Sequence, residues 1–234
     1  MKRFTFMLAG VLCASASLAA DYYVSVEGSG EKDGSSWENA IAFTEMYSNI
    51  NTKYQNGDVF YFQGGTYYVP AKVPTVSNGY SFIGATTGTP TVFSGDVNGD
   101  GVANEGDAPS LLFIKLDTKN GDDSKHFVLK NITFTGAYVN QTKTSTLRVD
   151  NSGWVDVQNC IFDKNISVYS NDNNYGGPAC LLERSTVNFT DCKFTNNESN
   201  GRGGAIKLTS DAQAKGYTTL NRCLVSGNKA SSLG

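Results

Sequence analysis

One segment of the chain carries the residue types of a metal site. Residues 96–107 read Asp-Val-Asn-Gly-Asp-Gly-Val-Ala-Asn-Glu-Gly-Asp, with side-chain oxygens at loop positions 1, 3, 5, 9 and 12 and glycine at position 6. Oxygen ligands at this spacing suit a hard cation such as Ca²⁺, and position 7 adds a backbone carbonyl. The predicted ligands are Asp96, Asn98, Asp100, Val102, Asn104 and Asp107. The ion would be structural; the alternative is a flexible turn without metal.

This loop resembles the calcium loops of dockerin domains, in which position 12 is also Asp. It departs from them immediately after position 12, where Ala108-Pro109 replaces the following helix. We therefore expect a single calcium loop that protrudes between two structural repeats.

A second set of residues could bind a sugar: Trp154, Tyr217, Arg148 and Lys207. Exposed aromatic rings stack on sugar rings, and basic side chains nearby can hold polar or acidic groups. The alternative is that the rings cover a sheet under a loop. The position of these residues in the repeats of the chain decides between the two hypotheses.

A sequence repeat sets the elements that must position these residues. The pattern Cys-x-x-x-x-Asn occurs at residues 160–165, 192–197 and 223–228, so its copies begin 32 and 31 residues apart. A second motif lies between them, as Gly-Gly-Pro-Ala at 176–179 and Gly-Gly-Ala-Ile at 203–206. A repeat of this period indicates a solenoid of stacked units.

Short strands precede each cysteine, because apolar and polar residues alternate there, as at Val155 and Val157. No helical pattern separates these strands, so a sheet with crossover helices is excluded. We predict an all-β fold, a parallel β-helix, in which each coil pairs with the coils above and below. Asn165, Asn197 and Asn228 would either stack as a ladder of side-chain amides or act as left-handed turn residues.

The paired motifs resemble the repeats of chlamydial polymorphic outer-membrane proteins. In those proteins Phe-x-x-Asn, found here at 162–165 and 194–197, alternates with Gly-Gly-Ala-Ile, found here at 203–206. The resemblance covers residues 146–234. It implies a right-handed β-helix displayed at a bacterial surface, adhesin-like, with no catalytic residues attached to the motif.

The alternative function is a polysaccharide lyase or glycoside hydrolase of the same fold, acting on an acidic polysaccharide. Such chemistry needs carboxylates that converge across a cleft, and a lyase also needs a basic residue. Aligning the coils on their cysteines places Arg148, Cys180 and Lys207 at one outward position. In this alignment no position holds two carboxylates. The acidic residues fall at different positions: Asp150, Asp163, Glu183 and Asp191. We therefore expect no catalytic residue in the part that aligns.

Residues 1–20 have the pattern of a secretory signal peptide, with Lys2 and Arg3 before an apolar run from Phe4 to Leu18. The run is too short for a membrane span, so we expect none in the mature chain and predict a secreted or outer-membrane-surface protein. Without those two residues, 17 of the 19 basic residues remain against 22 acidic ones, a formal charge of −5. This balance disfavours nucleic acid as a partner.

Residues 21–79 are predicted to form an N-terminal cap and the first coils. Residues 38–47 suit an amphipathic helix capped by Ser35 or Ser36, and a helix there would close the open end of the solenoid. The order of this segment is similar to the opening of secreted β-helix polysaccharide lyases. Residues 80–234 would form the β-helix, with the calcium-like loop inserted at 96–107. Since Gly234 falls within a coil, we expect the natural protein to be longer.

Three of the four cysteines that follow the signal, Cys160, Cys192 and Cys223, occupy the same repeat position. They would stack at the spacing of neighbouring strands, about 4.8 Å. We favour buried free thiols, Cys180 included, over an oxidised pair. The favoured function is a non-catalytic β-helix that binds a polysaccharide or a cell-surface glycan.

Overall fold

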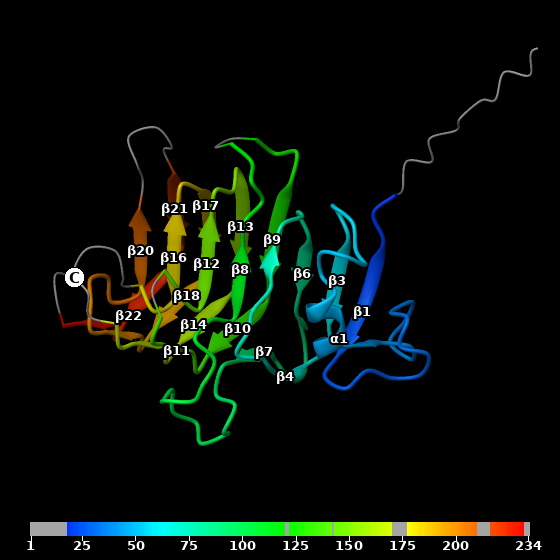
Figure 1. Ribbon diagram of the computed structural model, residues 1–234, viewed down its shortest axis with the longest axis horizontal. Helices are drawn as coiled ribbons and strands as arrows, with labels where there is room; N and C mark the ends of the chain where they lie inside the picture. Colours follow the sequence, from blue (N-terminus) through cyan, green and yellow to red (C-terminus); the bar gives the residue numbers. More distant parts are fainter. Residues whose placement is uncertain (1–17, 120–121, 142, 170–176, 210–215, 232–234) are drawn as a thin grey trace, which may run out of the picture.

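The computed structural model describes residues 18–119, 122–141, 143–169, 177–209 and 216–231. Within these ranges the chain forms a stack of coils, and the strands of successive coils pair in parallel to form four sheets (Figure 1). The predicted all-β solenoid of parallel strands is confirmed. Connections between parallel strands of one sheet are right-handed in about 98% of cases. The resemblance described from the sequence also predicts a right-handed β-helix. Most of the predicted signal peptide lies outside the described residues.

Each sheet takes one strand from each of several coils. In order of pairing, sheet A contains β2 (Ile41–Ala42), β1 (Asp21–Ser25), β3 (Val59–Phe62), β6 (Ser81–Ile83), β9 (His126–Lys130), β13 (Trp154–Gln158), β17 (Thr186–Thr190) and β21 (Tyr217–Asn221). Sheet B contains β4 (Gly65–Tyr68), β7 (Thr91–Ser94), β10 (Ile132–Thr135), β14 (Ile161–Asp163), β18 (Lys193–Thr195) and β22 (Leu224–Ser226). Sheet C contains β5 (Thr75–Val76), β8 (Leu112–Ile114), β12 (Leu147–Asp150), β16 (Cys180–Glu183) and β20 (Ile206–Thr209). Sheet D contains β11 (Tyr138–Val139), β15 (Ile166–Ser167), β19 (Glu198–Ser199) and β23 (Lys229–Ala230).

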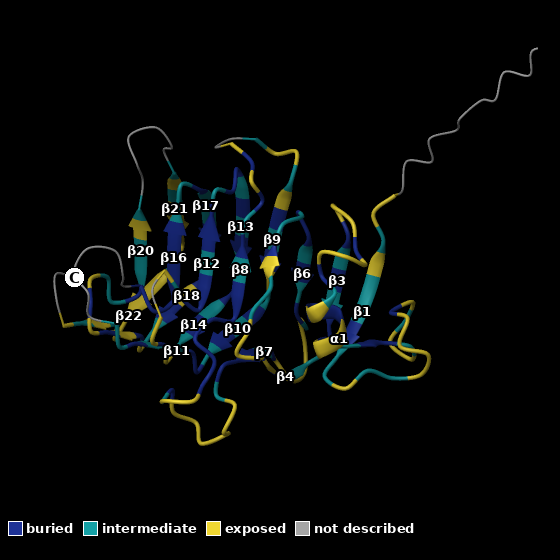
Figure 2. Cartoon of the chain, viewed as in Figure 1, coloured by how far each residue is buried: buried dark blue, intermediate teal, exposed yellow. Residues whose placement is uncertain are grey.

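Like side chains stack coil upon coil in the interior. In sheet B, Phe134, Phe162 and Phe194 are in register, and their ring centroids lie 5.0 and 5.1 Å apart. All three residues are fully buried. Buried residues run along many of the strands of the stack (Figure 2). Val225 continues the column in the next coil but is 57% exposed, because no further coil covers it in the described ranges. The repeated motifs therefore occupy equivalent positions in successive coils, as predicted.

Asn165, Asn197 and Asn228 form the predicted amide ladder. Nδ2 of Asn165 donates to Oδ1 of Asn197 at 3.0 Å, and Nδ2 of Asn197 donates to Oδ1 of Asn228 at 2.8 Å. The left-handed backbone falls one residue earlier, at Lys164 (φ 55°) and Asn196 (φ 53°). The alternative that the asparagines are left-handed turn residues is therefore wrong.

The second motif marks the entry into sheet C. Gly177 and Gly203 have left-handed backbone, with φ of 78° and 80°, and the amide of Gly177 donates to the carbonyl of Gly203 at 2.9 Å. A Cβ on Gly177 would collide with the carbonyl oxygen of Cys180 and with the amide nitrogen of Lys207 in the next coil. Both the conformation and the close approach of the coils require glycine here.

Helix α1 (Phe43–Ser48) begins later than predicted. Ile41 and Ala42 pair with β1 as strand β2, so the helix starts at Phe43, and its N-cap residue Ala42 makes no side-chain capping bond. The prediction that Ser35 or Ser36 caps the helix is therefore wrong. Its apolar face is as predicted, because Phe43, Met46 and Tyr47 are buried.

The buried face of α1 packs against inward rings of the first coils. The Phe43 ring lies 5.2 Å from the ring of Tyr67 and 5.2 Å from that of Phe93, measured between centroids. Apolar contacts therefore fix the helix near the N-terminal end of the stack (Figure 1). Within the described ranges, no helix has the length and apolarity needed to cross a bilayer.

Candidate functional site

The calcium-like loop connects β7 to β8 and projects from the coils (Figure 1). Its base is joined by a hydrogen bond of 2.9 Å from the amide of Ala108 to the carbonyl of Gly95. At its start, the carboxylate of Asp96 accepts hydrogen bonds from the amides of Gly99 and Gly101, each at 2.8 Å. The glycine-rich turn is therefore folded around the first predicted ligand.

The remaining predicted side-chain ligands close the loop. The Asp107 carboxylate accepts from the amide of Asn104 at 2.9 Å, and Nδ2 of Asn104 donates to Oδ2 of Asp100 at 2.6 Å. Nδ2 of Asn98 donates to Oδ1 of Asn104 at 3.1 Å. In the described part of the chain, no group of three His, Cys, Asp or Glu side chains could hold a metal ion. A cation here would therefore also need the asparagine oxygens and the carbonyl of Val102.

Trp154 and Tyr217 lie on the outer face of sheet A, in one column with Thr186 between them, as the repeat predicts. The indole of Trp154 is half-buried, and its Nε1 donates to Asp156 at 3.2 Å. Asp156 also lies 3.0 Å from Nε2 of His126, the neighbour of Trp154 in the preceding coil. Tyr217 is 59% exposed. One coil, that of Thr186, lies between them, so the two rings are two strand spacings, about 10 Å, apart along the stack.

Arg148 and Lys207 lie on the outer face of sheet C, across the corner from sheet A. Arg148 is in register with Leu181, and Leu181 with Lys207. The prediction that Cys180 shares this column is wrong, because Cys180 is buried and faces inward. The structure therefore groups the four predicted sugar-binding residues as two pairs on different sheets. Burial and the charge of Arg202 lower the pKa of Lys207, while Glu183 opposes that shift.

Two carboxylates share a register position, contrary to the prediction. Asp150 on β12 pairs with Glu183 on β16. Nε of Arg148 donates to Glu183 at 2.9 Å, its Nη2 lies 3.4 Å from Asp150, and Arg184 also pairs with Asp150. Because arginines engage both carboxylates, this pair is an ion-pair network and has no free acid and base facing each other.

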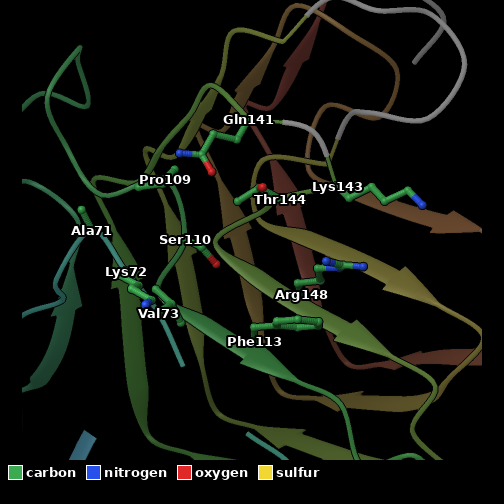
Figure 3. A pocket seen from close by; sticks show the side chains of 10 residues that line it. All are labelled: Ala71, Lys72, Val73, Pro109, Ser110, Phe113, Gln141, Lys143, Thr144 and Arg148. Atoms are coloured by element: carbon green, nitrogen blue, oxygen red, sulfur yellow. The ribbon is translucent and has the colours of Figure 1, made fainter. Parts of the chain in front are cut away.

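A pocket of about 220 Å³ opens beside this network on sheet C (Figure 3). Three of its lining side chains are basic, Lys72, Lys143 and Arg148, and none of the lining residues is acidic. Lys72 lies on one side of the pocket, and Lys143 and Arg148 lie on the other (Figure 3). The Arg148 guanidinium lies over the Phe113 ring, 4.3 Å from its centroid. The pocket therefore presents positive charge on an aromatic floor.

In the structure, four cysteines are free thiols: Cys160, Cys180, Cys192 and Cys223. Burial raises the pKa of Cys160, Cys180 and Cys192 well above that of an ordinary thiol. These groups are therefore protonated near neutral pH and are weak nucleophiles or metal ligands.

No protein-family model and no curated protein sequence matches the chain. Among solved structures, the chain is similar to the pectin methylesterase of Aspergillus niger, with 14% sequence identity and a TM-score of 0.42. The match covers 94% of this chain and 69% of that enzyme's chain. At this low identity, the activity of that enzyme is not assigned to this chain.

Proposed function

We propose that this chain is a β-helix module that binds an acidic glycan on the outer face of sheet C. The observation that carries the proposal is the gathering of Lys72, Lys143 and Arg148 around one pocket, in a chain with a formal net charge of −3. A local basic site in an acidic protein attracts anions. Ammonium and guanidinium groups make strong, charge-assisted hydrogen bonds with carboxylates and sulfates.

Arg148 is fixed before any ligand arrives. Glu183 and Asp150 hold its Nε and Nη2, and Phe113 supports its face. Among the described residues, these bonds engage Nε and Nη2, and we assign Nη1 to the ligand. A preorganised side chain loses little entropy on binding. Since small-molecule pockets usually measure about 300–1,000 Å³, this one suits a single charged sugar unit of a longer glycan.

We propose binding without cleavage, because arginines engage the neighbouring carboxylates of Asp150 and Glu183. A lyase or hydrolase acting on an acidic polysaccharide is the alternative. The shared register of Asp150 and Glu183 favours this alternative, since a ligand that displaced the arginines would free two adjacent carboxylates.

The double variant Lys72→Ala/Lys143→Ala is expected to weaken binding of oligogalacturonate about tenfold, roughly 1.4 kcal/mol. Both lysines are exposed, so the fold should tolerate the change. Isothermal titration measures the affinity, and a sulfated oligosaccharide titrated in parallel separates carboxylate from sulfate as the bound group. Lys193→Ala, which changes an exposed lysine on sheet B outside the pocket, is the matched control. Equal affinity in the double variant and the wild type would refute the basic pocket as the binding site.

Loop 96–107 is proposed to hold a structural Ca²⁺ through Asp96, Asn98, Asp100, Val102, Asn104 and Asp107. Support comes from the hydrogen bonds that link the side chains of Asn98, Asn104 and Asp100. The carboxylates of Asp96 and Asp107 accept hydrogen bonds from backbone amides of the same loop. A Ca²⁺ ion there would offset two of the three negative charges of Asp96, Asp100 and Asp107. It would also brace the wall of the basic pocket, because Pro109, which lines that pocket, lies two residues after Asp107.

Ca²⁺ is therefore expected to raise the melting temperature of the wild type, since an ion that binds only the folded state stabilises it. Asp100→Asn removes one charged ligand and should weaken Ca²⁺ binding at least tenfold. Glu105→Gln removes a charge from the same loop at a position that is not a predicted ligand, and should bind Ca²⁺ as the wild type does. Calorimetric titration checks all three proteins. Absence of binding heat at millimolar Ca²⁺ in the wild type would remove the assignment.

Secretion and surface display are part of the proposal. The signal-like residues 1–20 support export, and the motifs that resemble chlamydial surface repeats support an adhesin-like setting. Binding of a polysaccharide or cell-surface glycan would suit either location.

A further inference from the structure

We infer that a second pocket, at the N-terminal end of sheet A, binds a neutral sugar unit. The inference rests on the proposed function in one respect, that the ligand is a glycan. The pocket measures about 520 Å³ and lies between the loop residue Trp37, the strand residues Tyr61 and Ile83, the side chain of Gln63, and segment 84–87. Its volume is within the usual range for small-molecule sites, about 300–1,000 Å³.

An aromatic stack holds Trp37 in place beside this pocket. Trp37 is 43% exposed, and its ring meets Tyr23 edge to face with centroids 4.8 Å apart. Tyr23 in turn stacks on Tyr61 of the next coil at 5.6 Å. An exposed but fixed indole offers a flat apolar surface at small entropic cost, which is what the C–H face of a pyranose ring requires.

The polar groups of the pocket are uncharged. Gln63, Thr86 and Thr87 are exposed and supply amide and hydroxyl groups that can donate to and accept from sugar hydroxyls. None of the lining residues is charged. A uronate would find no counter-charge here, in contrast to the basic pocket on sheet C. The chemistry therefore selects a neutral hexose.

The pocket opens onto an outward column that extends along sheet A. Tyr61 is in register with Ile83, Ile83 with Lys130, and Lys130 with Gln158. Beyond Tyr61 and Ile83 this column is hydrophilic, with Lys130, Gln158 and Thr190 in successive coils. A linear oligosaccharide anchored at Trp37 can therefore run over successive coils.

The test is a titration with neutral hexose oligosaccharides, followed by tryptophan fluorescence and calorimetry. The wild type should show a saturable change in emission, and Trp37→Ala should bind at least tenfold more weakly. Trp37→Phe keeps an aromatic ring, so it should retain measurable calorimetric binding while losing most of the emission change. Tyr68→Ala, an exposed aromatic residue on sheet B that does not line the pocket, is the matched control and should bind as the wild type does.

Oligogalacturonate, titrated into the same proteins, separates this inference from the proposed function. Trp37→Ala should bind the acidic ligand normally. If the wild type binds oligogalacturonate but no neutral oligosaccharide, or if Trp37→Ala binds neutral oligosaccharides as the wild type does, the inference fails and the basic pocket stands. If the wild type binds neutral oligosaccharides alone, the Trp37 site stands and the proposed acidic ligand fails.

Discussion

Phe162→Ala is expected to lower the free energy of unfolding by about 3–5 kcal/mol, the usual loss for a buried phenylalanine. The ring is fully buried and stacks between Phe134 and Phe194, at 5.0 and 5.1 Å. Strand pairing holds the coils above and below at a fixed spacing, so they cannot close in on the cavity. Urea unfolding followed by circular dichroism measures the loss.

The control for this variant is Lys193→Ala, which removes an exposed side chain from the neighbouring strand β18. A surface change of this kind should stay within about 0.5 kcal/mol of the wild type. If Phe162→Ala costs no more than Lys193→Ala, the stacked rings are not the core of the coils.

Asn197→Ala is expected to cost roughly 3 kcal/mol. Nδ2 of Asn197 donates to the carbonyl of Phe162 at 3.0 Å and to Asn228 at 2.8 Å, and its Oδ1 accepts from Nδ2 of Asn165 at 3.0 Å. Alanine would remove these three hydrogen bonds in or near the interior, together with the one that the amide of Asn165 donates to Oδ1 of Asn197 at 3.1 Å. A buried group left unsatisfied costs about 1–3 kcal/mol. The same unfolding measurement applies.

Asn200→Ala is the matched control, because this exposed asparagine lies three residues further along the same coil. It should unfold with the wild-type midpoint. A loss for Asn197→Ala that is as small as that of Asn200→Ala would show that the amide ladder follows from the fold without stabilising it.

The register of the last coils could be predicted because like residues recur in the sequence at a nearly constant spacing. Cys160, Cys192 and Cys223, with the asparagines that follow them, place three coils in correct register by their spacing alone. An asparagine ladder needs identical residues at one corner, and the sequence shows them directly. In the earlier coils this regularity is lost: Phe93 pairs with Phe134, 41 residues later, whereas Phe134 pairs with Phe162, 28 residues later. The 96–107 loop accounts for much of the longer spacing.

The shared register of Asp150 and Glu183 could not be predicted from the cysteine spacing. The corner between β12 and β13 has three residues, 151–153, and that between β16 and β17 has only two, 184–185. A shift of one residue moves a side chain from one face of a strand to the other, which is why the cysteine alignment places Cys180 outward in error. The sequence does not reveal which corner is shorter.

The two pockets could not be predicted for a related reason. Trp37, Tyr61 and Ile83 come from a loop and two coils, and they meet only when the irregular first coils are stacked correctly. The repeat points to Arg148, but Lys72 and Lys143 lie in connecting segments without a repeat to place them. Their charge within an acidic chain is the one signal that the sequence offers.

Calorimetric titration of residues 21–234 with oligogalacturonate, while unsaturated products and new reducing ends are followed, tests acidic-glycan binding most directly. We expect saturable binding that weakens as salt screens the lysines and Arg148, with no shortening of the oligosaccharide. An absence of binding heat at low salt would contradict the proposal, and so would the appearance of shorter products.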